Sequence, residues 1–217
     1  VHGAHLRFEK NPYYWDADRI KLDVIDMPYV TNDPNAVLNL YKDGKIATAA
    51  LSAETLNDAL EHRWTINRFN DGSVFYTEFN HRPDRMTANV NLRRALSLVS
   101  DPGELVYKVM KLPGNQPGVS LFPAWLPGVN GLFRQEYPPE PVRVDVAEAR
   151  RYLELARQEL GIDTWPPLIL LTGDDPLSSS QAEYFQNVFK RTLGLDVKID
   201  KQIFKQRLAK MTAAEPT

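Results

Sequence analysis

Residues 73–110 read SVFYTEFNHRPDRMTANVNLRRALSLVSDPGELVYKVM, and their pattern predicts a strand, a loop and two helices in that order. In residues 73–80, aromatic and β-branched side chains recur with a period of two, which is typical of a strand. Apolar residues at i, i+4 and i+7 within 92–99 give the apolar face of a first helix. The Asp-Pro pair at 101–102 supplies an N-cap and a first helical residue, so a second helix is expected to continue to residue 110.

Further strands and helices alternate along the rest of the chain. Strands are expected at residues 5–10, 20–29, 46–50, 64–69, 168–171 and 195–200. Helices are expected at residues 33–44, 53–61, 145–160, 179–193 and 202–211. Asn32 or Asp33 is the expected cap of the first of these helices, and Asp145 with Glu148 forms a capping box for the third. The strand-helix-strand order of the last third predicts an α/β fold with at least partly parallel strands.

The composition is that of an ordinary soluble globular chain. Of the 217 residues, 43% are hydrophobic, and 26 Lys and Arg stand beside 28 Asp and Glu. This near balance gives no reason to expect a nucleic acid or an anionic membrane as a partner. No apolar run approaches the ~18 residues of a membrane span. Because the sequence contains no cysteine, disulfides and thiolate chemistry are excluded.

Residues 111–145 contain seven prolines and irregularly spaced aromatic side chains. One interpretation is an ordered wrap whose aromatics pack on the core. Another is that some of the aromatics face a ligand cleft, because long irregular stretches in compact domains are often functional. A third hypothesis is a protein-interaction module built on this Pro-rich segment.

No nucleophile elbow, phosphate-binding loop or dinucleotide-binding motif occurs in the sequence. The four histidines have no partner at metal-ligand spacing, so neither a metal nor another cofactor is expected. Asp174 and Asp175 are interpreted as turn residues, and the serines at 178–180 as the cap of the next helix, whose N-terminus could receive a ligand carboxylate. The alternative is a hydrolase that uses Asp174 or Asp175 with Ser178, although a serine nucleophile needs a base and none stands nearby.

The strand expected at residues 73–80 has two different faces. One of them is mixed and carries Val74, Tyr76, Glu78 and Asn80. Such a face suits the wall of a cleft, where a ring and an amide contact a ligand backbone. It also suits an ordinary sheet surface, and the pattern alone leaves both interpretations open.

Four motifs occur in order along nearly the whole chain. The pattern F-N … V-x-x-R-R-A-L-S-L … D-x-x-x-L-V-x-x-V is carried by Phe79, Asn80, Val90, Arg93, Arg94, Ala95, Leu96, Ser97, Leu98, Asp101, Leu105, Val106 and Val109. The other three lie at residues 11–16 (N-P-x-Y-W), 40–46 (L-Y-x-x-G-E-I-D) and 188–195 (W-K-K-N-L-G-I). Together they resemble the extracytoplasmic solute-binding proteins of the peptide/nickel class, which serve ABC importers.

The resemblance implies a periplasmic-binding-protein-like α/β fold, type II and cluster C, with two lobes. Residues 1–72 would be the returning part of the first lobe. Residues 73–217 would be the first part of the second, ligand-closing lobe, with the crossover near Asp71 and Gly72. The architecture would be incomplete in this chain.

The resemblance also implies a function. Such a protein captures oligopeptides, dipeptides, nickel complexes or related solutes between its lobes and delivers them to the permease subunits of the importer. It is not an enzyme and does not itself span the membrane. It is periplasmic, or extracellular and lipid-anchored in a Gram-positive source. The ligand-binding residues that this implies are Tyr76, Asn80, Thr172, Asp174 and Ser178.

The sequence departs from the family pattern in places. Lys45 stands where the family usually has an acidic residue, and Ala47 where it often has Asp. The chain also stops before the segment with the aspartate that holds a peptide's amine. It is therefore expected to be a fragment of a longer binding protein, to self-associate through uncovered strand edges, and to bind peptide weakly by itself.

Overall fold

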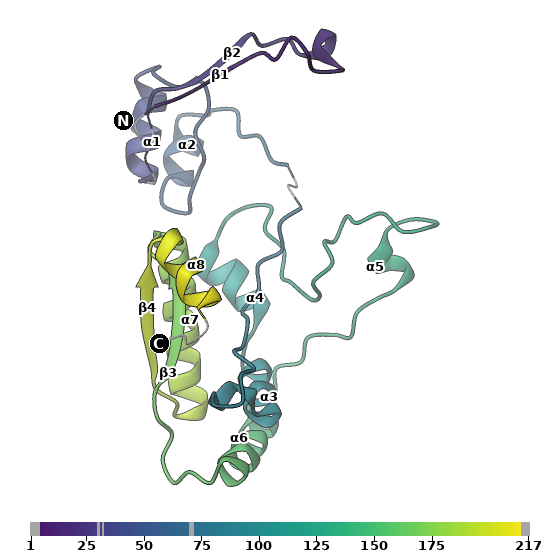
Figure 1. The fold of residues 1–217 in the computed structure, drawn as a ribbon, viewed down its shortest axis with the longest axis vertical. Helices are drawn as coiled ribbons and strands as arrows, with labels where there is room; N and C mark the ends of the chain where they lie inside the picture. The colour runs from purple at the N-terminus through teal and green to yellow at the C-terminus, as the bar shows by residue number, and fades with distance from the viewer. Residues whose placement is uncertain (1–4, 30, 32, 70–71, 214–217) are drawn as a thin grey trace. The chain divides into compact units, whose positions relative to one another are not determined.

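The computed structural model describes residues 5–29, 31, 33–69 and 72–213 (Figure 1). The chain divides into two compact units, Val1–His62 and Arg63–Thr217. The predicted lobe boundary between residues 72 and 73 differs from this division, and the lobe assignment stays a prediction. Asp71 of the predicted crossover lies outside the described residues.

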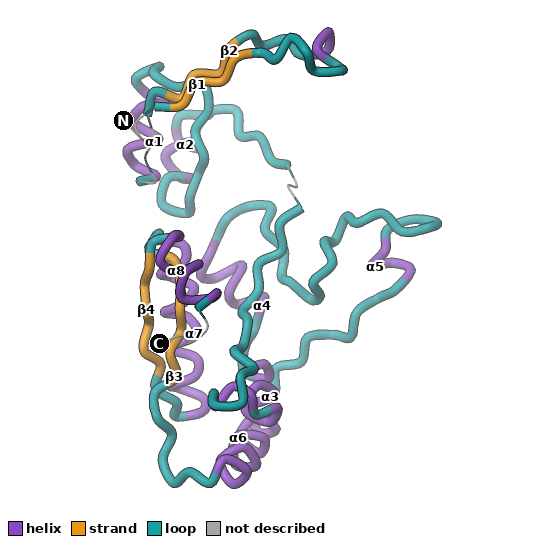
Figure 2. Tube along the Cα trace, in the orientation of Figure 1, coloured by secondary structure: helices purple, strands orange, loops and turns teal. Residues whose placement is uncertain are grey.

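A two-stranded antiparallel hairpin opens the first unit. β1 (Leu6–Glu9) pairs with β2 (Val24–Met27), so that Leu6 lies opposite Met27. All residues of both strands are exposed, and Figure 2 shows the two strands as orange tubes that run side by side. The first predicted strand is therefore confirmed, whereas the second is shorter than the predicted 20–29.

Two helices complete the first unit, α1 (Pro34–Lys42) and α2 (Leu56–Glu61). Asp33 caps α1, since its side chain accepts a hydrogen bond from the backbone N–H of Asn35. The prediction of a cap at this point is confirmed, while the other candidate, Asn32, lies outside the described residues.

The second unit contains a parallel β-α-β motif. β3 (Leu168–Gly173) and β4 (Val197–Gln202) pair in parallel, and α7 (Pro176–Leu193) connects them. Gly194 ends α7 with a φ of 72°, a left-handed conformation that glycine adopts without strain. α8 (Phe204–Thr212) follows and contacts both strands. The predicted parallel α/β arrangement is therefore confirmed.

Two further helices, α3 (Val90–Leu98) and α6 (Val146–Leu160), pack side by side in this unit (Figure 1). The Asn89 side chain caps α3. Asp145 caps α6 by accepting a hydrogen bond from the Glu148 N–H, as the predicted capping box requires.

Two buried clusters hold the second unit together. The first joins α3 and α6 to the sheet and consists of Leu92, Ala95, Leu96, Leu153, Ala156, Leu168, Leu195 and Val197. The second joins α6 and α7 and consists of Val99, Ala149, Tyr184 and Val188. The apolar face predicted within residues 92–99 is therefore buried, and burial of apolar surface is the main source of stability here.

The second helix of the opening stretch differs from the prediction. Asp101 is the cap, as predicted, and α4 (Pro102–Glu104) is α-helical. The chain then continues as η3 (Leu105–Met110), which has π-helical rather than α-helical hydrogen bonding. The remaining short elements are η1 (Ala17–Arg19), η2 (Met86–Ala88) and α5 (Phe133–Glu136).

Three predicted strands, at residues 46–50, 64–69 and 73–80, are wrong as strands. Alternating side chains favour an extended backbone, but a strand also needs a hydrogen-bonded neighbour. In the described part of the chain, no backbone hydrogen bond reaches residues 74–79 from another segment. These residues are extended without being part of a sheet.

The irregular segment 111–145 contains a cluster of aromatic rings. The rings of Phe122 and Phe133 lie 4.8 Å apart, and those of Phe133 and Tyr137 lie 5.2 Å apart. Neither buried cluster contains an aromatic residue of this segment. The interpretation that its aromatics pack on the core is therefore wrong for this ring cluster.

Candidate functional site

The extended segment 73–80 carries two of the predicted ligand residues. Tyr76 is 64% exposed, so its ring is accessible to a ligand. The side-chain oxygen of Asn80 accepts a hydrogen bond from the Arg82 N–H at 3.1 Å. The backbone carbonyl of Asn80 accepts one from the Thr87 hydroxyl at 2.7 Å. Asn80 is thus fixed by local contacts at the end of the segment, whereas Tyr76 projects from its middle.

The loop after β3 brings Thr172 and Ser178 together. The Thr172 hydroxyl donates to the Ser178 carbonyl at 3.3 Å. The Ser178 N–H and hydroxyl donate to the two carboxylate oxygens of Asp175, at 2.9 Å and 2.5 Å. Asp174, the remaining predicted residue, is exposed beside them. The loop is therefore a preformed turn with exposed polar groups.

Asp175 is the N-cap of α7, a role that the sequence interpretation gave to the serines at 178–180. The helix begins at Pro176, earlier than the predicted residue 179. The missed signal was the Asp-Pro pair, the same pair that correctly predicted the cap at 101–102. Burial opposes ionisation of Asp175, but hydrogen bonds from the Ser178 hydroxyl and from backbone N–H groups lower its pKa overall.

Gly173 allows this turn to close. A Cβ at this position would lie 2.8 Å from a carboxylate oxygen of Asp175 and 2.9 Å from the Ser178 hydroxyl. Both distances are shorter than ordinary contacts, so a larger residue would displace the capping side chains. That this loop and the pair Tyr76 and Asn80 bind one ligand stays a prediction.

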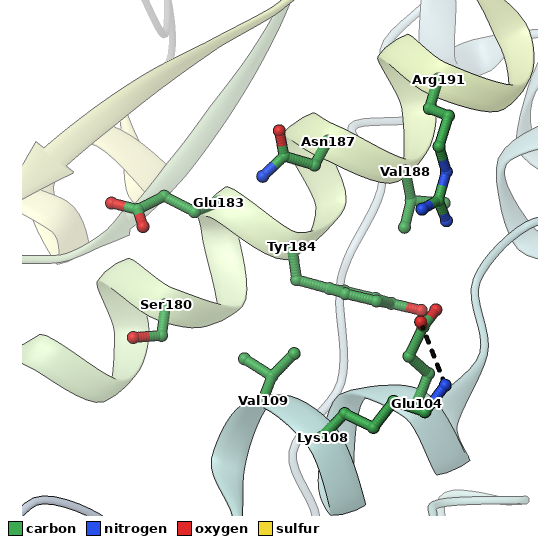
Figure 3. A pocket seen from close by; sticks show the side chains of 9 residues that line it. All are labelled: Glu104, Lys108, Val109, Ser180, Glu183, Tyr184, Asn187, Val188 and Arg191. Carbon is green, nitrogen blue, oxygen red and sulfur yellow. Dashed lines mark ion pairs between the residues drawn. The ribbon is translucent and has the colours of Figure 1, made fainter.

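A polar groove of about 370 Å³ lies between η3 and α7 (Figure 3). Tyr184 and Val188 lie on its α7 side, and Glu104 pairs with Lys108 at 3.6 Å on the opposite side. None of the five predicted ligand residues lines this groove. A second hollow, of about 480 Å³, is formed within the first unit by the β1–β2 hairpin and its connecting turn.

The described residues offer no metal centre and no membrane span. Among them, no three His, Asp or Glu side chains gather closely enough to hold a metal ion. Within the same residues, no helix combines the length and apolar character needed to cross a bilayer.

Comparison with known families identifies the class of protein. The family "bacterial extracellular solute-binding proteins, family 5, middle" matches residues 1–216, which is nearly the whole chain. The chain therefore belongs to this family of solute-binding proteins, as the four motifs suggested.

Curated relatives that the chain matches are peptide-binding proteins by name. The dipeptide-binding protein DppE of Bacillus subtilis is 26% identical over 91% of this chain and 36% of its own length. The oligopeptide-binding protein OppA of the same species is 29% identical over 92% of this chain and 36% of its own length. The chain thus spans little more than a third of these relatives.

Solved structures agree with the fold. OppA of Listeria monocytogenes, solved bound to peptide, matches with a TM-score of 0.77 and 28% identity over 94% of this chain and 40% of its own. An oligopeptide ABC transporter substrate-binding domain of Bacillus anthracis matches with a TM-score of 0.76 and 27% identity. The match covers 96% of this chain and 40% of that one. The fold is thus the periplasmic-binding-protein-like α/β fold, of which this chain covers a part.

Proposed function

We propose that this chain is part of the solute-binding component of an ABC importer that captures peptides and delivers them to a membrane permease. The observation that carries the proposal is the family match over residues 1–216, together with relatives named for dipeptide and oligopeptide binding. Tyr76, Asn80, Thr172, Asp174 and Ser178 are the proposed ligand contacts. The protein acts outside the cytoplasmic membrane, in a periplasm or anchored by lipid on a Gram-positive surface.

The chemistry of the proposed site suits binding. An exposed tyrosine ring provides apolar contact area with a hydroxyl at its tip, which is a common combination at recognition sites. Hydroxyl and carboxylate groups of the 172–178 loop can hydrogen-bond the backbone or termini of a peptide.

The hydrolase alternative has no support in this geometry. The Ser178 hydroxyl donates a hydrogen bond to one carboxylate oxygen of Asp175, and the other oxygen caps α7 by accepting from the Ser178 N–H. A carboxylate whose pKa is lowered is a weak base, and a serine nucleophile needs a stronger one close by. The relatives are named as binding proteins, not as enzymes.

Calorimetric titration of the full-length protein with a set of short peptides tests the proposal. Tyr76→Ala is expected to weaken binding by about 1–3 kcal/mol, the scale of an anchoring aromatic side chain. The matched control is Tyr107→Ala, because Tyr107 is equally exposed at 66% but lies on η3. Unchanged affinity in Tyr76→Ala would remove this ring from the site, and absence of peptide binding by the wild type would refute the function.

A further inference from the structure

The segment that carries Tyr76 is extended but is not part of a sheet. Among the described residues, no backbone hydrogen bond from another segment reaches residues 74–79. At the far end, Phe79 packs against the larger buried cluster, and Asn80 accepts the hydrogen bond of Thr87. The position of Tyr76 therefore depends on these anchors and on whatever holds the segment at Gly72.

At Gly72 the anchor is an indole ring. A Cβ built on Gly72 would lie 3.4 Å from Cζ2 and 3.6 Å from Cη2 of Trp125, so the ring lies directly against this backbone position. Gly72 has a φ of 91°, which an L-residue adopts only with strain. Trp125 is 41% exposed, and hence more than half covered.

Trp125 is itself presented by a hydrogen-bonded turn. The Leu126 N–H donates to the Pro123 carbonyl at 3.2 Å, and the Phe133 N–H donates to the Leu126 carbonyl at 2.9 Å. The Glu136 carboxylate accepts hydrogen bonds from the N–H groups of the same turn at Val129 and Asn130. The backbone that carries the ring is therefore held by hydrogen bonds within its own turn.

A second contact of the same kind lies just before the segment. A Cβ on Gly114 would be 2.5 Å from Cδ of Arg68, so the Arg68 stem crosses the glycine backbone. Both contacts join the chain around Gly72 to residues 111–145 of the same unit. They explain how a chain without a strand ladder can enter the 73–80 segment in a defined direction.

We infer that Trp125 is a positioning residue for the ligand site: its indole fixes Gly72 and thereby the placement of Tyr76 and Asn80. The inference rests on the proposed function, since it takes Tyr76 as a ligand contact. An extended chain advances about 3.3 Å per residue, so Tyr76 lies about 13 Å along the chain from this anchor. A shift of the backbone at Gly72 would therefore also displace Tyr76.

The first measurement needs no ligand. The 217 residues contain no cysteine. In the full-length protein, with any cysteine outside these residues replaced by serine, Phe75→Cys and Ser97→Cys can carry a pair of spin labels, one on the segment and one on α3. We expect a narrow distance distribution in the parent, in Trp125→Phe and in Val129→Ala. Trp125→Ala is expected to broaden it at least twofold. An equally narrow distribution in Trp125→Ala would overturn the inference.

The second measurement is peptide affinity by calorimetry in the same backgrounds without labels. Trp125→Ala is expected to weaken binding five- to 30-fold, with rescue to within threefold by Trp125→Phe, which keeps a ring over Gly72. Val129→Ala, a change at an exposed residue of the same turn, is expected to stay within twofold. If Trp125 had only a structural role, its variants would be less stable, but Trp125→Ala and Trp125→Phe would not differ in peptide affinity.

The two measurements distinguish the inference from the function on which it rests. If Tyr76→Ala weakens binding but Trp125→Ala does not, the positioning role is wrong and the proposed function stands. If the wild type binds no peptide, the proposed function fails, and a broadened distance distribution in Trp125→Ala still supports the anchor. An unchanged distribution in that case refutes the anchor as well.

Discussion

The hydroxyl of Tyr184 makes two hydrogen bonds that can be removed without changing the shape of the core. Tyr184 lies on α7 and is 8% exposed. Its hydroxyl accepts from the Asp101 N–H at 3.0 Å and donates to the Asp101 carbonyl at 3.1 Å. Burial raises the pKa of this hydroxyl, so it remains a donor at neutral pH. Through these bonds α7 holds the residue at which α4 begins.

Tyr184→Phe keeps the ring and deletes both bonds. Each is worth about 0.5–1.5 kcal/mol net, and the Asp101 backbone groups also lose their partner, so we expect a loss of about 1–3 kcal/mol. For a domain of 150–250 residues this corresponds to a fall in Tm of roughly 2–12 °C. The ring keeps its contacts with the second buried cluster, so no cavity adds to this figure.

Urea unfolding of the full-length protein measures the effect as a lower midpoint at unchanged slope. Tyr76→Phe is the matched control, because it deletes a hydroxyl from an exposed tyrosine, and it should stay within about 0.5 kcal/mol of the wild type. If the two variants are equally stable, the hydroxyl of Tyr184 does not hold α4 to α7.

Three further predictions concern the core, an ion pair and a free sheet edge. Leu92 is 0% exposed, so Leu92→Ala should lower the free energy of unfolding, measured with urea, by about 2–5 kcal/mol. A smaller loss would show that the neighbouring side chains collapse into the cavity. The Asp200 carboxylate accepts hydrogen bonds from Lys210, at 2.6 Å, and from Gln202. The Lys210 bond and, to a smaller extent, the Gln202 bond lower the pKa of Asp200. Because the folded pKa of Asp200 lies below its unfolded pKa, these contacts stabilise the fold by up to about 1 kcal/mol above pH ~4. This stabilisation is lost as the pH falls further. The urea midpoint of Asp200→Asn should therefore vary less with pH over this range, and a profile parallel to the wild type would contradict the pairing. The isolated 217-residue chain should self-associate through the two-stranded β3–β4 sheet, where Ile169 is exposed, and a concentration-independent monomer in sedimentation would refute this.

Helix ends could be predicted from the sequence because a cap is a local device. Asp33, Asp101 and Asp145 each accept hydrogen bonds from the first turn of their helix, as their position before a proline or an acidic capping partner indicated. Gly161 and Gly194 both end helices with positive φ. All the information needed for these features lies within four residues.

Strands could be predicted less well because their partners are distant in sequence. The strands predicted at residues 5–10 and 195–200 formed, because each pairs with another strand, β1 with β2 and β4 with β3. The equally regular pattern at 73–80 receives, within the described residues, no backbone hydrogen bond from another segment at residues 74–79, so it is extended without being part of a sheet. Periodicity therefore predicted the conformation of this segment, and not its place in a sheet.

The candidate site was predicted in part for the same reason. The polar turn at Thr172 and Ser178 follows from local signals, and the structure brings these two residues together. The role of Trp125 could not be predicted, because it depends on a contact with Gly72 across more than fifty residues of sequence. An aromatic residue in an irregular, Pro-rich segment carries no periodic signal to identify its partner.

The pair Asp175 and Ser178 shows how structure separates binding from catalysis. In sequence, a carboxylate three residues before a serine fits both a helix cap and the start of a nucleophilic site. In the structure, both carboxylate oxygens accept hydrogen bonds from Ser178, and hydrogen bonds from backbone N–H groups help to keep the carboxylate ionised. A carboxylate whose pKa is held low in this way stabilises the turn but is a weak base for activating a nucleophile. What the turn offers is a rigid set of polar groups before α7, and rigidity of this kind favours ligand binding because less entropy is lost on association.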